Sequence, residues 1–232
     1  LFQGYHFAQP EVVSGRRLTA LQTTIIQLIN LAARDADTAA IEDGIKRDPA
    51  LAVNLLSIVN SVAYNLSRRI GSLRQAVTVL GRRQLQRWLQ LLIYTNPKGG
   101  GQGENPLLQL AATRGRMMEL LAERVTPRNR EFADQGFMVG IMSLMPALLG
   151  VAIEEILAQL PVAPRVQMAL VDRTGLHGQL LQVVEATEQT DPAILEEALQ
   201  RVPGIDLDFL EECLTQALFW ANNLGREKTD DA

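Results

Sequence analysis

Apolar residues recur at intervals of three and four along almost the whole chain, and this spacing most constrains what the chain can fold into. No run of four or more residues alternates between apolar and polar in the manner of a half-buried strand, apart from residues 4–7. One apolar face, expected for a helix over residues 18–32, is formed by Leu18, Leu21, Ile25, Leu28 and Ala32. The sequence therefore predicts an all-α, multi-helix bundle.

Paired signals mark where several helices begin. Asp48 can cap a helix whose first position is Pro49, because proline lacks the N–H that would otherwise be unsatisfied there. Asp191 and Pro192 repeat this pair. Asp37 or Thr38, and then Ser72, are further caps, and Gly81 suits a left-handed helix end. Additional helices are expected at residues 82–94, 107–125, 130–144, 147–160 and 209–224, with a Gly- and Pro-rich loop at 95–106.

The chain has 232 residues, of which 47% are hydrophobic, and this is enough to bury a sizeable core. Its single cysteine, Cys213, excludes an internal disulfide framework. Two neighbouring acidic residues favour a raised thiol pKa, so we expect a core residue rather than a nucleophile. No apolar run approaches the roughly 20 residues of a membrane-spanning helix. We therefore expect a cytoplasmic protein without a membrane span.

The charged residues are distributed unevenly. Residues 49–103 contain seven basic residues and no Asp or Glu, a net charge of +7. Residues 185–232 contain twelve acidic and three basic residues, a net charge of −9. A basic surface attracts anionic partners such as nucleic acid, a nucleotide or an acidic protein. Alternatively, the two segments face each other within the fold, and the sequence leaves both interpretations open.

An ordered set of motifs lies within residues 47–81. These motifs are Asp48-Pro49, Asn60-Ser61, Tyr64, Arg69-Ile70, Ser72 and Leu80-Gly81. Together they resemble the signature region of the HDOD domain, a helical bacterial signalling module related to the HD and HD-GYP phosphohydrolases. The similarity continues in residues 171–188 and 217–224, as in HDOD domains that are fused to EAL domains, and covers about residues 18–225. The resemblance implies an HD-like (HDOD) helical fold and a role in signal transduction.

The first ten residues, LFQGYHFAQP, resemble the closing strand of an EAL domain, the fold whose active members hydrolyse cyclic di-GMP. The first four of them also resemble part of a protease-cleavage tag. The chain lacks an initiator Met, so we expect a longer protein with an EAL domain upstream. The expected organisation is an EAL-like end and linker at residues 1–14, an HDOD domain at 15–225 and a disordered tail at 226–232. Any phosphodiesterase activity of the EAL domain would lie upstream of this chain.

Histidines are scarce for a metal-dependent phosphohydrolase. Relatives with HD activity hold their metals with several histidines and aspartates, which lower the pKa of a bound water. This chain has only His6 and His177, and Ser143 and Leu144 stand where the His-Asp pair would be expected. The glycine run at 99–103 is not followed by the Lys-Ser/Thr of a phosphate loop. We therefore expect no enzymatic activity, catalytic residue, bound metal or cofactor.

The turn after the third predicted helix, residues 60–74, is the candidate docking surface for a partner. The side chains of Asn60 and Ser61, at the end of a helix, can satisfy its backbone groups, and this structural role alone would explain both residues. The arginines have no acidic residue three or four positions away, and unpaired guanidinium groups suit recognition of carboxylate or phosphate. The candidate docking residues are Asn60, Ser61, Tyr64, Arg68, Arg69 and Arg74.

The preferred interpretation is a non-enzymatic regulatory domain of a cyclic-di-GMP-related EAL-HDOD protein. Its expected partners are an unidentified signalling protein and the upstream EAL domain of the same chain. A homodimer is left open. Two alternatives are a residual metal-dependent nucleotide phosphohydrolase and a nucleotide or nucleic-acid binder acting through the basic segment 68–98. We do not favour nucleic acid, and a binder of that kind would lose affinity steeply with salt.

Overall fold

The regular elements of the computed structural model are α-helices throughout the residues that it describes, which are 20–33, 38–61, 70–94, 106–160 and 162–224. Their order along the chain is α1 (Ala20–Ala33), α2 (Thr38–Lys46), α3 (Pro49–Val59), α4 (Leu73–Leu92), α5 (Pro106–Val125), α6 (Arg130–Met142), α7 (Met145–Leu149), α8 (Ile153–Leu157), α9 (Pro164–Val171), α10 (Gly175–Thr187), α11 (Pro192–Gln200) and α12 (Leu207–Asn222). The all-α prediction is confirmed. The expected EAL-like end, the expected tail and the loop at 95–105 lie outside the described residues.

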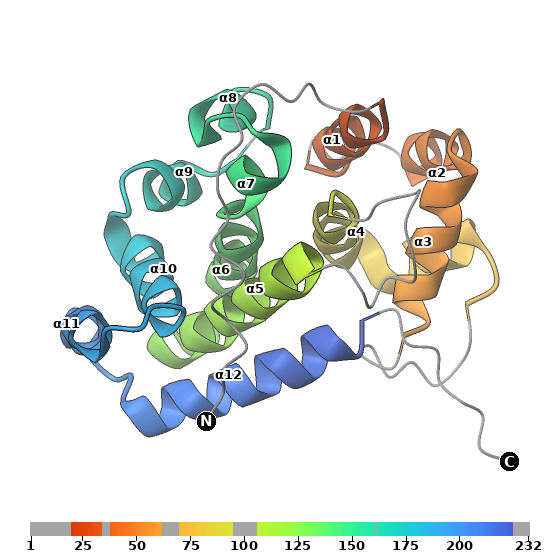
Figure 1. The fold of residues 1–232 in the computed structure, drawn as a ribbon. Coiled ribbons are helices and arrows are strands. Elements are labelled where there is room, and N and C mark those ends of the chain that lie inside the picture. The colour runs from red at the N-terminus through yellow and green to blue at the C-terminus, as the bar shows by residue number, and fades with distance from the viewer. Residues whose placement is uncertain (1–19, 34–37, 62–69, 95–105, 161, 225–232) are drawn as a thin grey trace, which may run out of the picture.

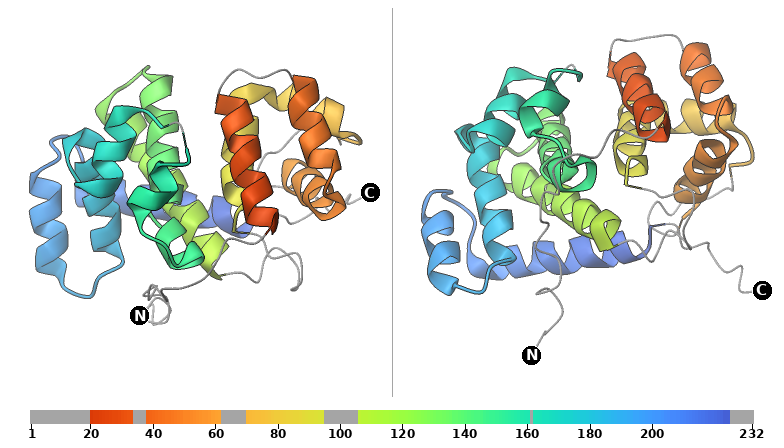
Figure 2. Two further views of the ribbon diagram at one scale, coloured as in Figure 1. Left: turned by 90° about the horizontal axis from the view of Figure 1, so that it is seen from above. Right: turned by 45° about the horizontal axis from the view of Figure 1, so that its top comes forward.

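The helices form two groups that lie side by side (Figures 1 and 2). The amino-terminal group consists of α1 to α4, and the carboxyl-terminal group of α5 to α12. In the second group α5 packs against α6 and α12, while α10 packs against α5, α9 and α11. Helix α4 contacts α1, α2 and α3 on one side and α5 and α6 on the other. It is therefore the main connection between the two groups.

Three predicted helix starts are confirmed by side-chain caps. The backbone N–H of Leu51 donates to the Asp48 carboxylate at 3.1 Å, one turn into α3. Ser72 caps α4 by accepting from the N–H of Gln75 at 3.2 Å. Asp191 in turn caps α11, where Pro192 occupies the first position. Each cap satisfies a backbone donor that has no partner inside its helix, and so fixes where the helix begins.

Two glycines interrupt helices for the same conformational reason. Gly81 has φ 67° and ψ 169°, a backbone conformation that side-chain-bearing residues rarely adopt, and it divides α4 into two stretches. This agrees with the prediction that one helix ends at Gly81 and another follows. The prediction of a single helix over residues 147–160 is wrong. Gly150, with φ 70°, ends α7, and α8 begins separately at Ile153.

The most extensive helix packing joins α5 to α6. A Cβ atom added to Gly140 would lie 2.6 Å from the backbone oxygen of Arg114, so only glycine allows this approach. The stretch Arg130–Leu149, which covers α6 and α7, is long and apolar enough to cross a membrane by composition alone. However, 67% of its most apolar window is buried inside the fold. This stretch is therefore part of the buried core.

Candidate functional site

Asn60 holds together the two ends of the predicted docking turn. Its side-chain amide donates to the carbonyls of Leu56 and Ile70, both at 2.9 Å, and its side-chain oxygen accepts from the N–H of Ile70 at 2.7 Å. Ser61 is almost fully buried. Both residues therefore face the protein rather than solvent, which agrees with the structural role considered for them in the sequence. Tyr64, Arg68 and Arg69 lie outside the described residues.

Arg74 is the one candidate docking residue that the structure places on the surface. Its side chain is 81% exposed, at the first turn of α4. Its Nε lies 3.5 Å from the carboxylate of Glu42 on α2, a partner that local spacing could not indicate. Glu42 is held more closely by Lys46 at 2.6 Å, and the hydrogen bond from Lys46 keeps the pKa of Glu42 below its ordinary value. Arg74 therefore stays accessible to a partner.

The second half of α4 contributes to a partly buried charge network, which we call the Arg87 network. Arg87 donates to both carboxylate oxygens of Glu119, at 2.6 and 2.7 Å, and its guanidinium lies 3.8 Å from the ring centre of Phe137. Arg116 donates to the same Glu119 at 2.6 Å. Burial alone would raise the pKa of Glu119, but its hydrogen bonds to the two arginines and their charges lower it.

Two of the basic side chains from residues 49–103 form ion pairs with acidic side chains on α5 and α6. Arg83 pairs with Asp134 on α6, and Arg87 lies 3.6 Å from the other oxygen of that carboxylate. In the described part of the acidic segment, residues 185–224, the ion pairs of Glu185, Glu188 and Glu197 are with Arg114, Arg173 and Arg201. Among the described residues, the ion pairs therefore do not support the interpretation that the two oppositely charged segments face each other.

A second buried network, which we call the Arg114 network, surrounds Ser143. Arg114 on α5 donates to both carboxylate oxygens of Glu188 at 2.6 Å and to the Ser143 hydroxyl at 2.9 Å. Ser143 in turn donates to the carbonyl of Gly140 at 2.7 Å. Glu185 accepts from Arg173 at 3.0 and 3.2 Å. A fixed guanidinium therefore lies beside the position where an HD relative would be expected to carry its His-Asp pair.

The residues of this network fit a divalent metal poorly. Both oxygens of Glu188 are used by Arg114, and the positive charge of Arg114 opposes the approach of a cation. Leu144, beside Ser143, is buried and apolar. Across the described part of the chain, no three His, Cys, Asp or Glu side chains lie close enough together to hold a metal ion.

Two further side chains with reactive groups, His177 and Cys213, lie buried in the fold. His177 is buried, stacks on Phe132 with ring centres 3.8 Å apart, and contacts the Phe132 carbonyl through Nε2 at 2.9 Å. Burial lowers the pKa of His177. Cys213 is buried, and burial raises its thiol pKa to about 11, as the sequence predicted in direction. The Cys213 thiol is therefore protonated at neutral pH and is a poor nucleophile, while the His177 ring is occupied by its contacts with Phe132.

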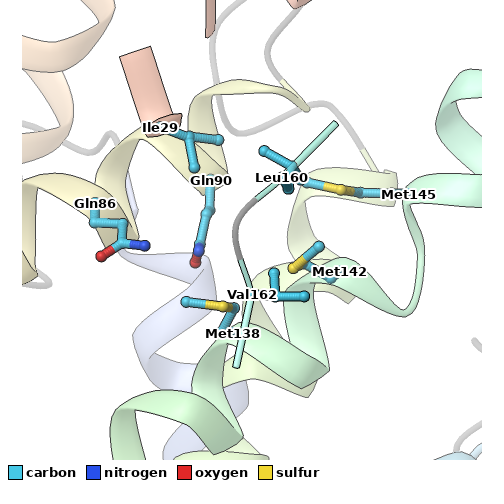
Figure 3. A pocket seen from close by; sticks show the side chains of 8 residues that line it. All are labelled: Ile29, Gln86, Gln90, Met138, Met142, Met145, Leu160 and Val162. Carbon is cyan, nitrogen blue, oxygen red and sulfur yellow. The ribbon is translucent and has the colours of Figure 1, made fainter. Parts of the chain in front are cut away.

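A small cavity lies where the two helix groups meet (Figure 3). Gln90 and Gln86 from α4 line one side of it. The other lining residues are Ile29, Met138, Met142, Met145, Leu160 and Val162. Gln90 is only 2% exposed, and its side-chain oxygen has no hydrogen-bond partner among the described residues. Gln90 is not among the site residues predicted from the sequence, although a polar residue inside the apolar run Trp88–Tyr94 was a usable signal.

Comparison with protein families identifies the fold. A model of the HDOD domain matches residues 17–151. The chain belongs to the HDOD domain family. The matched residues include α1 to α7, and with them Asn60, the Arg87 network and Ser143. The HDOD resemblance drawn from the motifs is therefore confirmed.

Two curated relatives match nearly the whole chain. The uncharacterized protein YuxH of Bacillus subtilis strain 168 is 29% identical over 226 residues, which are 97% of this chain and 54% of YuxH. The cyclic di-GMP phosphodiesterase CdgJ of Vibrio cholerae is 30% identical over 226 residues, which are 97% of this chain and 51% of CdgJ. The chain thus spans about half the length of these relatives. One of the two is linked by name to cyclic di-GMP.

A solved structure supports the fold assignment. The crystal structure of a candidate phosphohydrolase from Shewanella amazonensis SB2B superposes with a TM-score of 0.55 and 18% identity. The match covers 95% of this chain and all of that one. It shows that the helices are arranged in an HD-like fold, and at this identity it concerns the fold alone.

Proposed function

We propose that this HDOD domain is a non-enzymatic regulatory module that docks a partner protein. The Arg114 network carries the first part of this proposal. A guanidinium bonded to Ser143 and Glu188 stands where an HD enzyme would need metal ligands. The site therefore holds its own side-chain cation, and the arrangement serves stability instead of activating a water.

The docking part rests on the surface at the start of α4. Arg74 is exposed there, next to a turn whose ends Asn60 holds together, and residues 49–103 contain no acidic side chain. In this proposal Tyr64, Arg68, Arg69 and Arg74 contact the partner, while Asn60 and Ser61 maintain the turn. The partner surface would present carboxylates, because guanidinium groups form paired hydrogen bonds with them.

The proposed context is a cyclic-di-GMP signalling protein with an EAL domain preceding this one. CdgJ, a relative named as a cyclic di-GMP phosphodiesterase, is about twice as long as the matched region. The sequence LFQGYHFAQP resembles the end of an EAL domain. We therefore propose that the upstream EAL domain acts on cyclic di-GMP, and that the HDOD domain passes the resulting signal to its partner in the cytoplasm.

The docking proposal is tested by pull-down from native lysate followed by mass spectrometry. The test variant combines Tyr64→Ala, Arg68→Glu, Arg69→Glu and Arg74→Glu. The control variant carries Arg130→Glu and Arg165→Glu, which reverse two exposed charges elsewhere on the surface. A protein retained by the wild type and the control but lost by the test variant is the expected result. Identical partner sets for all three would refute docking at this turn. Nucleic acid retained by the wild type and lost by the test variant would mean that the partner is a nucleic acid and not the proposed protein.

The non-enzymatic part has a separate assay. The domain is incubated with cyclic di-GMP, or with a generic phosphodiester, in the presence of Mn²⁺, Mg²⁺ or Ni²⁺. No turnover above the metal alone is expected. Metal-dependent turnover that Glu188→Gln abolishes would overturn the proposal and favour a residual phosphohydrolase.

A further inference from the structure

The Gln90 side chain presents an unmet hydrogen-bonding requirement at the junction of the two helix groups. Its oxygen is buried and has no partner within the described residues, although the same side chain lies in a cavity wall. Buried polar atoms in folded proteins are nearly always hydrogen-bonded, either to protein or to an ordered water, because an unpaired acceptor is destabilising. This atom therefore calls for a donor that the described residues do not supply.

The size of the cavity restricts what that donor can be. Its volume is about 10 Å³, which is close to the space needed by a single water molecule. Apart from the two glutamines, its walls are three methionine thioethers and the aliphatic side chains of Ile29, Leu160 and Val162. Such walls disfavour an ion, whose lost hydration they cannot replace. The occupant must be small, neutral and able to donate a hydrogen bond.

We propose that the Gln90 cavity is an internal water site. One water molecule donates to the side-chain oxygen of Gln90 and has the Gln86 amide as its second polar neighbour. Figure 3 shows these two amides on the α4 side of the cavity, with the methionines Met142 and Met145 opposite. The inference is independent of the proposed docking function, since it rests on the interior of the fold.

The position of this site gives it a structural consequence. Ile29 and the two glutamines belong to the amino-terminal group, and the other lining residues belong to the carboxyl-terminal part of the chain. A nearby bond also crosses this junction, from the Asn30 amide to the Gln159 carbonyl at 2.9 Å. A water molecule can exchange hydrogen bonds as the groups shift, and methionine adapts to changes in shape. The site therefore makes the contact between α4 and α6 adjustable.

A high-resolution crystal structure of the wild-type domain tests the proposal directly. We expect ordered density for one water within hydrogen-bonding distance of the Gln90 side-chain oxygen. A well-ordered cavity without water density would overturn the proposal. This measurement requires no variant, so it is decisive even if substitutions impair folding.

Substitutions provide a second, independent readout. Gln90→Met keeps the length of the side chain and removes its need for a donor, so the water should be lost and the thermal midpoint should be unchanged or raised. Gln90→Ala leaves a larger void and should lower the midpoint. Gln167→Met, at an exposed position on α9, controls for the added methionine. A Gln90→Met domain that retained the water would show that Gln90 does not hold it, and would count against the proposal.

Discussion

Arg114 shows how much of this fold depends on single buried charges. Its side chain is 9% exposed, and its guanidinium contacts Glu188, Ser143 and, at 3.7 Å, Glu185. The cost of removing its charge from water is offset only while these partners are present. The same logic applies to Arg87, whose partner Glu119 is 7% exposed. At the scale of the residue, then, each buried arginine is tolerated only while its carboxylate partner is present.

Arg114→Ala should therefore destabilise the domain by about 3 kcal/mol, because it leaves the Glu188 carboxylate without its buried partner. Arg201→Ala is the matched control, since Arg201 pairs with Glu197 at the surface, where both side chains are at least half exposed. The control should cost less than about 0.5 kcal/mol. Urea unfolding of both variants measures the difference. Equal losses would show that burial of the Arg114 pair contributes nothing extra.

Glu119 should make stability depend on pH in the acidic range. Because its pKa is lowered in the folded state, the unfolded chain takes up this proton first as the pH falls. The stabilisation is thus complete above the ordinary glutamate pKa and is lost as the pH falls through the lowered value. Glu119→Gln should be less stable than wild type at neutral pH, and the gap should narrow as the pH falls below the ordinary glutamate pKa and through the lowered one. Urea midpoints across this range, with Glu196→Gln as an exposed control, check the prediction; a gap that is independent of pH would contradict it.

At the scale of the element, local signals in the sequence were sufficient for most helix starts. The caps Asp48 and Ser72 act on backbone donors three residues away, so their effect can be read from neighbouring letters. The partners of Arg74 and Arg87 could not be read in this way, because Glu42 and Glu119 are each 32 residues away in sequence. The Gln90 cavity likewise depends on helices that meet only in the folded chain. Gly150 also carried a local signal, because a left-handed glycine commonly ends a helix, yet the predicted helix ran through it where the structure has two.

Gly81 provides a test of how α4 is divided. Its φ and ψ fall where a side chain is strongly disfavoured, although no atom lies within 4 Å of the position a Cβ would take. Gly81→Ala should therefore cost about 1–3 kcal/mol through backbone strain rather than collision. Gly71→Ala is the control, since Gly71 is exposed and lacks a positive φ. Urea unfolding with circular dichroism compares them. Unchanged stability for Gly81→Ala, with a gain in helix, would show that the two stretches of α4 can merge freely.

At the scale of the whole molecule, α4 connects the proposed docking surface to the junction between the helix groups. Its first turn carries Arg74, and its second stretch carries Arg87 and Gln90. The described links across the junction include the Arg87 network, the Asn30 bond to Gln159 and the packing around the cavity. A force applied at the start of α4 would therefore act on the element that joins the two groups. This arrangement suits a regulatory module whose two groups respond to binding.

Arg87→Ala should weaken that junction without unfolding either group completely. The variant removes the bond to Glu119 and the contact with Phe137, both of which join α4 to the carboxyl-terminal group. Amide hydrogen exchange, followed by mass spectrometry, should accelerate in α1 to α4 and change little in α5, α6 and α12, because local openings follow the units that pack together.

The matched control is Arg116→Ala. Arg116 donates to the same carboxylate as Arg87 but lies on α5, in the same helix as Glu119. Arg116→Ala therefore removes a charge partner of Glu119 without breaking a contact between the two helix groups. Amide hydrogen exchange in α1 to α4 should stay close to that of the wild type. If both variants accelerated amide exchange equally in the amino-terminal group, the effect would come from the unpaired charge of Glu119 and not from the loss of the contact between α4 and α5. If Arg87→Ala accelerated exchange uniformly along the chain, the two groups would unfold as one unit, and a regulatory movement between them would have no structural basis.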